Sequence, residues 1–347
     1  MGKRNYSLDL LKLLAAWFVV MVHPFQRTPF MGMPLTTETA FLLTTFQNLI
    51  ITCVPLFFIT SGYLLANREI NARHYRALLN FLVESTLLLA VAYVLNHTYN
   101  DLAMGEKDLL KFVLNPPYYV SFHIGLYLLA PYLNRLVGTL KQREEAGLLF
   151  LITGLVAIPA FMKAFEIEYF HTFIRSAYPL VYYFLGGYLR RYPLQLKQRT
   201  KLILAAAALL LNSILIFWLA DGGVYDPFIG TYDNLLIIAA TALIFSFFSQ
   251  LNVPETIASK TAGFLAQYTL AYYIMGDYYS DIIARNIDFL RVSKNIRIAF
   301  LHTPVVGLTS MAVTTVIAIP TVWLAGRLTQ IIQKQLDRML LKSNQQT

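Results

Sequence analysis

The feature that most constrains this chain is a succession of long apolar segments separated by short polar loops. A helix that crosses a bilayer needs roughly 20 mostly apolar residues. The candidate segments lie near 8–27, 42–66, 75–97, 118–137, 146–163, 174–190, 201–220, 233–250, 261–284 and 304–326. The sequence therefore predicts an all-α, polytopic membrane helix bundle of about ten transmembrane helices. A single membrane-embedded domain is expected over 1–347, without a soluble domain.

Composition supports a membrane protein. Hydrophobic residues make up 57% of the chain and charged residues only 14%, against about 25% charged in soluble domains. The single cysteine, Cys53, excludes an internal disulfide and a cysteine metal cluster, so no metal is expected. The first apolar segment lacks a small-residue cleavage site and contains Asp9 and Lys12, which predicts a retained first spanning helix.

The distribution of Lys and Arg predicts the orientation. Cytoplasmic loops carry an excess of these residues, and an even number of spans with both termini inside leaves roughly two thirds of them on the cytoplasmic side. The net charge of +9 is then explained by topology, and no nucleic-acid partner is expected. The basic loop 285–303 falls outside under this arrangement and is the exception. The predicted location is a bacterial inner (plasma) membrane.

Several ionisable residues lie inside the predicted spans. Such residues are costly in a bilayer and are functional hypotheses by default. For each one the alternative is a paired structural contact or a group that reaches the interface. The residues are Asp9, Lys12, His23, Glu84, His123, Asp277 and Asp281.

Lys12 and His23 form the most specific pair. They are eleven positions apart, about three helical turns, so both project from nearly the same face, separated by roughly 16 Å along the axis. Asp9 lies one turn before Lys12. This geometry suits a long anionic cofactor inserted end-on, with the cation near phosphates and a neutral histidine accepting a proton from an attacking hydroxyl. The equally simple alternative is a buried Asp9–Lys12 pair with a histidine close to the outer interface.

The pattern of Lys12, ten residues and then His23 resembles the signature of the acyltransferase 3 family. These are ten-helix membrane enzymes that transfer acyl groups, usually acetyl from acetyl-CoA, to sugars of surface glycans. Three further segments resemble segments of the family in the expected order. They are 54–64, which contains Ser61-Gly62-Tyr63-Leu64, 124–131, which contains Tyr127 and Pro131, and 183–189. The overall sequence pattern is similar to that of the family branch that includes enterobacterial-common-antigen O-acetyltransferases.

The resemblance implies roles for particular residues. His23 would be catalytic, with Ser61 and Tyr127 assisting, and Tyr63 is a further candidate for stabilising the oxyanion. For the co-substrate, acetyl-CoA or another acyl-CoA, the resemblance implies Lys12 and Gly62; Asp9 beside Lys12 and the inner-loop cations Arg73, Arg76 and Arg135 are further candidates to meet it. The candidate residues for a glycan or lipid-linked sugar acceptor are His123 and Asp277, and Arg285 and Arg291 of a basic loop that could receive an anionic glycan or carrier. The alternative for Ser61-Gly62 is simple helix packing, and for the basic loop 285–303 it is contact with anionic lipid headgroups.

One departure from the family pattern bears on the acceptor. Members often carry Tyr-Leu-x-His in the ninth helix, whereas this chain has Tyr273-Ile274-Met275-Gly276 followed by Asp277. A second hypothesis is a polytopic transporter or exporter of a glycan or small metabolite, because ten helices with intramembrane charges fit that class equally well in outline. The absence of an inverted repeat in the sequence argues against it. A third is an acyltransferase-like scaffold without activity.

Overall fold

The computed structural model describes residues 4–69, 71–99, 106–163, 165, 167, 172–225, 231–276 and 296–344. Regular structure in these residues is helical, apart from one isolated antiparallel bridge between Pro34 and Val224. A spanning helix satisfies every backbone polar group within its own segment, which hydrocarbon requires. The predicted fold class, an all-α polytopic helical bundle, is confirmed.

The α-helices are α1 (Tyr6–Gln26), α2 (Glu38–Ile50), α3 (Cys53–Leu65), α4 (Ala72–Tyr99), α5 (Glu106–Leu114), α6 (Tyr118–Gly138), α7 (Gln142–Lys163), α8 (Tyr178–Arg191), α9 (Gln198–Ala220), α10 (Leu235–Ser249), α11 (Ile257–Leu265) and α14 (Ile296–Asn344). Short 3-10 helices cover Pro29–Gly32, Thr172–Ala177 and Ala266–Tyr268.

Six helical segments of the described chain are long and apolar enough to cross a membrane. They are Tyr6–Gln26, Glu38–Leu65, His74–Tyr99, Gln142–Met162, Gln198–Ala220 and His302–Met339. The helix α10 is apolar but shorter, and α8 has 14 residues. The chain is thus a multi-pass membrane protein, and the count of ten spans stays a prediction.

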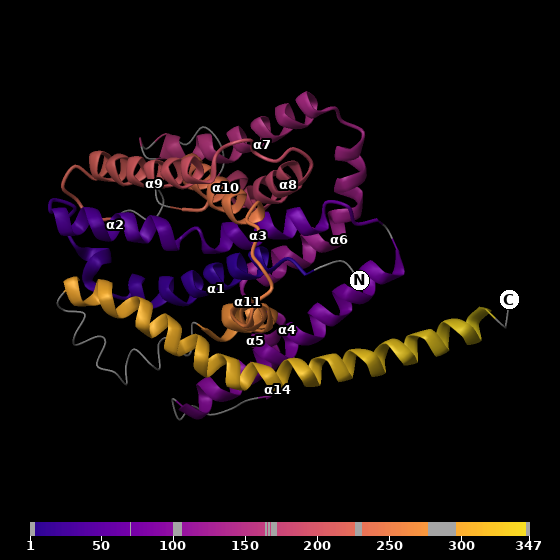
Figure 1. Cartoon of the computed structure of the whole chain (residues 1–347). Helices are drawn as coiled ribbons and strands as arrows, with labels where there is room; N and C mark the ends of the chain where they lie inside the picture. The colour runs from indigo at the N-terminus through magenta and orange to yellow at the C-terminus, as the bar shows by residue number, and fades with distance from the viewer. Residues whose placement is uncertain are drawn as a thin grey trace.

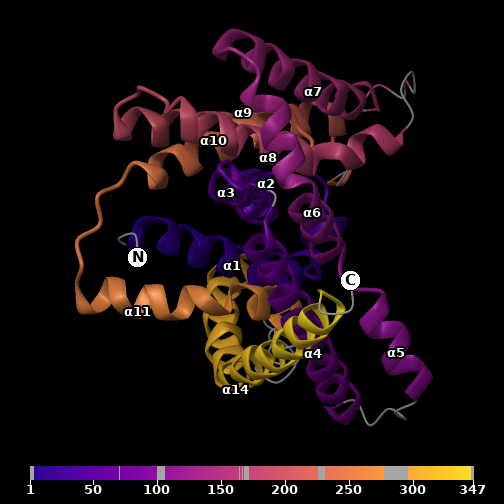
Figure 2. The same ribbon diagram turned by 90° about the vertical axis from the view of Figure 1, so that its right-hand side faces the viewer.

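Two helices, α1 and α3, form the centre of the bundle. The helix α3 packs against α8 on one side and α1 on the other, and α1 also packs against α14. Figure 1 shows the result as layers, with α7 to α10 on one side of α3 and with α4, α11 and α14 on the far side of α1. Seen end-on, α11 lies beside the start of α1 (Figure 2). Fully buried apolar side chains of these two helices include Leu11, Val20, Leu56 and Phe58.

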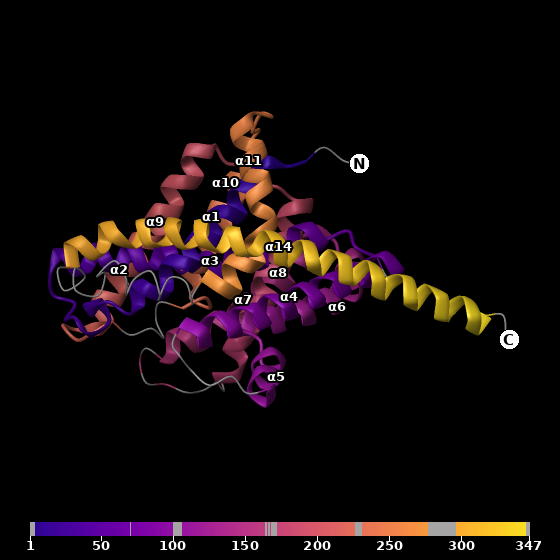
Figure 3. The same ribbon diagram turned by 90° about the horizontal axis from the view of Figure 1, so that it is seen from below.

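The structure differs from the predicted segments in two main places. Segment 42–66 is broken into α2 and α3 at Ile51 and Thr52, because Pro55 has no N–H to offer the carbonyl of Ile51. The last helix continues well past residue 326 to Asn344, and this extension projects beyond the bundle (Figure 3). Of the predicted segment 261–284, residues 277–284 lie outside the described residues.

Hydrogen bonds and ion pairs connect the ends of neighbouring helices at one end of the bundle. The contacts are Ser7 of α1 with the carbonyl of Phe248 in α10, Arg190 of α8 with the carbonyl of Tyr63 in α3 (2.7 Å), Asn134 of α6 with the carbonyl of Leu65 in α3 (2.7 Å), Arg191 of α8 with Glu145 of α7, and Lys201 of α9 with Gln250 after α10. We call this the basic end. Here α1, α7 and α9 begin and α3, α6, α8 and α10 finish, as expected for helices that alternate in direction.

The crossing of α3 and α8 depends on two glycines. A Cβ atom added at Gly62 would collide with the carbonyl oxygen of Tyr183, and one added at Gly186 would collide with the carbonyl oxygen of Ile59. The colliding atoms are backbone, which cannot move aside as a flexible side chain can. Small residues permit this close approach of two membrane helices, so Gly62 occupies the helix-packing position that the sequence allowed as an alternative.

We expect Gly62→Ala to destabilise the bundle by about 1–3 kcal/mol or more, because α3 and α8 must separate to admit the methyl group. Thermal unfolding of the purified protein in detergent measures the effect. Gly147→Ala is the matched control, since a Cβ at Gly147 in α7 meets no atom within 4 Å and alanine is the better helix former. Equal melting temperatures for the Gly62→Ala protein and wild type would contradict the packing role.

Candidate active site

The start of α1 positions the first two polar residues of the predicted stripe. The side chain of Asn5 accepts hydrogen bonds from the backbone N–H groups of Ser7 (3.1 Å) and Leu8 (3.2 Å), which caps the helix. Asp9 then falls in the first turn, where a carboxylate is stabilised by the helix dipole. Lys12 follows one turn later, so that both side chains lie at the basic end.

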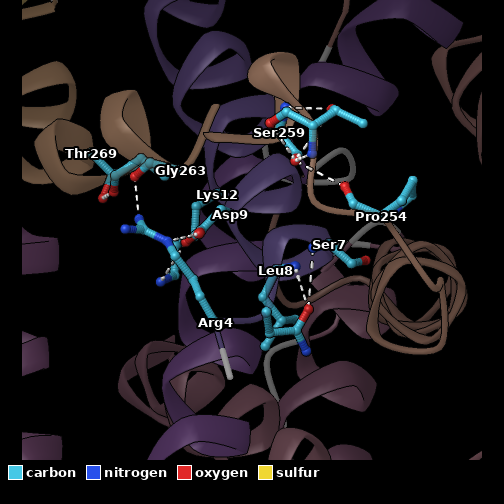
Figure 4. A network of polar contacts seen from close by, with 12 residues as sticks. Arg4, Ser7, Leu8, Asp9, Lys12, Pro254, Ser259, Gly263 and Thr269 are labelled. Carbon is cyan, nitrogen blue, oxygen red and sulfur yellow. Dashed lines mark hydrogen bonds and ion pairs between the residues drawn. The ribbon is translucent and has the colours of Figure 1, made fainter. Parts of the chain in front are cut away.

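Asp9 is held between two cations (Figure 4). Nε of Arg4 donates to Oδ2 of Asp9 at 2.6 Å, and Nζ of Lys12 lies 3.8 Å from Oδ1. The guanidinium of Arg4 also donates to the carbonyl of Gly263 in α11. The Asp9 side chain is 9% exposed and that of Lys12 28% exposed. Arg4 is therefore the closer partner of the carboxylate, and the Lys12 ammonium keeps access to the space beside it.

That space is a cavity of about 340 Å³. Its walls come from α1, α3, α4, α6 and the segment that follows α11. The lining residues are Lys12, Phe57, Thr60, Ser61, Leu64, Ala77, Asn80, Phe81, Glu84, Tyr119, His123, Tyr127, Gln267, Thr269, Leu270 and Tyr273. Four residues that were given site roles from the sequence, Lys12, Ser61, His123 and Tyr127, thus meet in one polar cavity. We call it the central cavity.

His123 on α6 is the histidine of this cavity. Its ring lies 4.6 Å from the ring of Phe81, 5.6 Å from that of Tyr119 and 6.0 Å from that of Tyr127, measured between ring centroids. Its Nδ1 atom is buried and has no hydrogen-bond partner in the described chain. The imidazole is therefore fixed by aromatic contacts rather than by hydrogen bonds.

Ser61 and Tyr127 are each held by a local contact. The hydroxyl of Ser61 donates to the carbonyl of Phe57 at 2.9 Å, one turn back in α3. The ring of Tyr127 stacks on that of His74, with centroids 4.3 Å apart and planes 11° apart. His74 is fully buried, and its Nε2 lies 2.7 Å from the carbonyl oxygen of Tyr127. His74 thus fixes α4 against α6 beside the cavity.

His23 lies near the end of α1 and is half-buried. It is not among the described residues that line the central cavity. Ala16 and Val19, which are buried, lie between Lys12 and His23 on the same side of the helix. His23 therefore continues the face that Lys12 presents to the cavity, about three turns further along the axis.

Of the other predicted site residues, Arg76, Arg135 and Tyr63 are not among the described residues that line the central cavity. Arg76 pairs with Asp337 of α14 at 2.7 Å, and both side chains are about half exposed. Arg135 is exposed at the end of α6. Arg73 lies in the first turn of α4 at the basic end. Tyr63 faces Phe245, with Arg190 over its ring. Asp277, Arg285 and Arg291 lie outside the described residues.

Several residues of the cavity were not assigned to a site from the sequence. Glu84 was noted as an intramembrane carboxylate without a role, and it makes no ion pair in the described chain. Asn80 lies one turn before Glu84 on the same face of α4, and this i, i+4 pair of polar residues within a predicted span was a usable signal. Gln267 and Thr269 carry no such signal, because only the packing of their segment against α1 brings them to the cavity.

The family model for the acyltransferase domain matches residues 5–323. The chain belongs to the acyltransferase 3 family. This confirms the suspected resemblance and shows that the protein is a membrane acyltransferase. No curated protein and no solved structure matches the chain. The match covers α1 to α11 and the first half of α14, and so it includes every wall of the central cavity.

We expect the central cavity to admit water-soluble reagents from the basic end. Cysteines introduced as Lys12→Cys and Gln267→Cys should react with a charged methanethiosulfonate about tenfold faster than Cys53, since a thiol buried in apolar surroundings is inert. Because Cys53 is fully buried, we expect the native thiol to add little to the measured labelling. Thr44→Cys, at a fully buried position away from the cavity, is the control. A similar rate at all these positions would show that the cavity is closed to solvent.

Proposed function

We propose that the protein transfers an acyl group, most simply acetyl, from acyl-CoA to a hydroxyl of a cell-surface polysaccharide or lipid-linked glycan at a bacterial inner membrane. The observation that carries the proposal is the arrangement on α1. Lys12 opens on a polar cavity beside the basic end, and His23 lies on the same helix face about three turns away. A cation and a proton acceptor separated in this way match a substrate that is anionic at one end and reactive at the other.

The central cavity suits the extended arm of an acyl-CoA. Lys12 offers a compact positive charge for phosphate, and cations of the basic end, Arg73 and Arg135 among them, add to the attraction. The walls beyond Lys12 carry hydroxyl and amide groups, such as those of Thr60, Asn80 and Gln267, that can pair with the amides of a pantetheine chain. Apolar side chains such as Phe57, Phe81 and Leu270 complete the lining, and a pocket that combines apolar walls with convergent polar groups is typical of small-ligand binding.

The proposed reaction is a direct acyl transfer. A sugar hydroxyl gives its proton to His23 while its oxygen attacks the thioester carbonyl carbon. The carbon–sulfur bond then breaks, and the CoA thiolate takes the proton from His23. An ester and free CoA leave, and His23 returns to its neutral form. Histidine suits this role because its ordinary pKa lies close to neutral pH.

We expect His23→Ala to abolish acyl transfer without loss of membrane insertion, because the acceptor hydroxyl then has no base. Mass spectrometry of surface glycans and lipid-linked precursors from cells that express each variant measures the acyl ester. His97→Ala is the control, since His97 lies at the other end of α4 from the basic end, bonded to the carbonyl of Tyr93. Full acylation of the glycan in the His23→Ala strain would reject His23 as the base.

We expect Lys12→Ala to raise KM for acetyl-CoA by about 10- to 100-fold, the equivalent of one charge-assisted hydrogen bond. The value of kcat should change much less, since Lys12 lies about three turns from His23. Steady-state kinetics in detergent or nanodiscs separate the two parameters. The control is Lys260→Ala, which removes an exposed cation paired with Glu255 at 3.0 Å. An unchanged KM in Lys12→Ala would make Lys12 a structural partner of Asp9.

A further inference from the structure

The proposed reaction creates a negative charge that needs a hydrogen-bond donor. When the hydroxyl oxygen attacks, the thioester carbonyl oxygen becomes an oxyanion, and preorganised donors at that position are often the largest single contribution to acyl transfer. Three residues were candidates from the sequence: Ser61, Tyr63 and Tyr127. In the structure the hydroxyl of Ser61 already donates its hydrogen to the carbonyl of Phe57. Tyr63 is not among the described residues that line the cavity.

His123 has the environment of a neutral donor. A proton on its Nδ1 would be a buried N–H without an acceptor, which proteins almost never tolerate, whereas a lone pair there costs less. The proton therefore belongs on Nε2, the ring nitrogen that is not among the buried, unpartnered atoms. Because the ring lines the central cavity, this tautomer offers the cavity one N–H group.

The ring is also held in place before any ligand binds. Phe81 of α4 packs 4.6 Å away, and Tyr119 and Tyr127 lie one turn on either side of His123 in α6. A donor fixed by packing does not have to reorganise when charge develops, which is the physical basis of oxyanion stabilisation.

We propose that Nε2–H of His123 donates to the thioester carbonyl oxygen and stabilises the oxyanion. This rests on the proposed function, because it takes acyl-CoA as the occupant of the central cavity. The two histidines then have separate tasks on separate helices. His23 of α1 accepts and returns the proton, while His123 of α6 stays neutral throughout and gives a hydrogen bond.

The test uses the difference in reach between glutamine and asparagine. The amide nitrogen of Gln can occupy the position of Nε2, whereas that of Asn falls short and Leu has no donor. We expect kcat to fall about 100- to 1,000-fold in His123→Leu and His123→Asn, and to stay within about tenfold of wild type in His123→Gln. KM for acetyl-CoA should change little. Loss in His123→Gln equal to that in His123→Leu would overturn the donor role, as would wild-type activity in His123→Leu. His97→Gln is the matched control.

A second readout does not depend on turnover. Infrared spectroscopy of acetyl-CoA labelled with ¹³C at the thioester carbonyl reports hydrogen bonding to that oxygen when the ligand is bound. We expect the bound carbonyl band to shift to lower wavenumber in wild type and His123→Gln, and to lose this shift in His123→Leu. A shift that persists in His123→Leu overturns the inference alone, because acetyl-CoA is still bound. Absence of any bound band in wild type overturns the proposed function itself, and the inference with it.

Discussion

The structure depends on one constraint, that polar groups within a bilayer must be satisfied by the protein itself. The spanning helices therefore turn their few polar side chains inward, and those side chains meet. Arg4 and Lys12 neutralise Asp9, and the same arginine binds the carbonyl of Gly263. This small cluster fixes the start of α1 against α11. Because Arg4 is the closer partner of the Asp9 carboxylate, the ammonium of Lys12 stays beside the central cavity.

The walls of that cavity are helix stripes of regular spacing. On α3 the lining residues are Phe57, Thr60, Ser61 and Leu64, and on α4 they are Ala77, Asn80, Phe81 and Glu84, each set following the i, i+3, i+4, i+7 pattern of one helix face. Gly62 lies on a different face of α3, where it meets Tyr183 of α8. The close crossing of α3 and α8 therefore orients the cavity-lining face of α3. Gly62, which does not line the cavity, determines in this way the direction in which that face points.

Much of this arrangement was predictable from the sequence, for a physical reason in each case. Apolar run length predicted the helices, and helical spacing alone placed Lys12 and His23 on one face. Local rules missed the continuation of α14 to Asn344, because its polar residues end the apolar run but not the helix. They also missed the partnership of Arg4 with Gly263 and the approach of Gln267 and Thr269 to Lys12. Such contacts join residues some 250 positions apart, and no local pattern encodes them.

The separation of the two histidines follows from what each site can tolerate. A base must gain a proton during the reaction, so it has to sit where a positive charge is supported for part of the cycle. His123 is surrounded by aromatic rings, and its Nδ1 has no hydrogen-bond partner among the residues that the structure describes, so a proton added there would be a buried, unpaired donor on a charged ring. The same aromatic contacts hold its other nitrogen in a fixed position, and a donor fixed in advance stabilises an oxyanion without reorganising. An environment that makes His123 a poor base therefore suits the donor role that we propose for it, and in the proposed reaction the role of base falls to His23, further along α1.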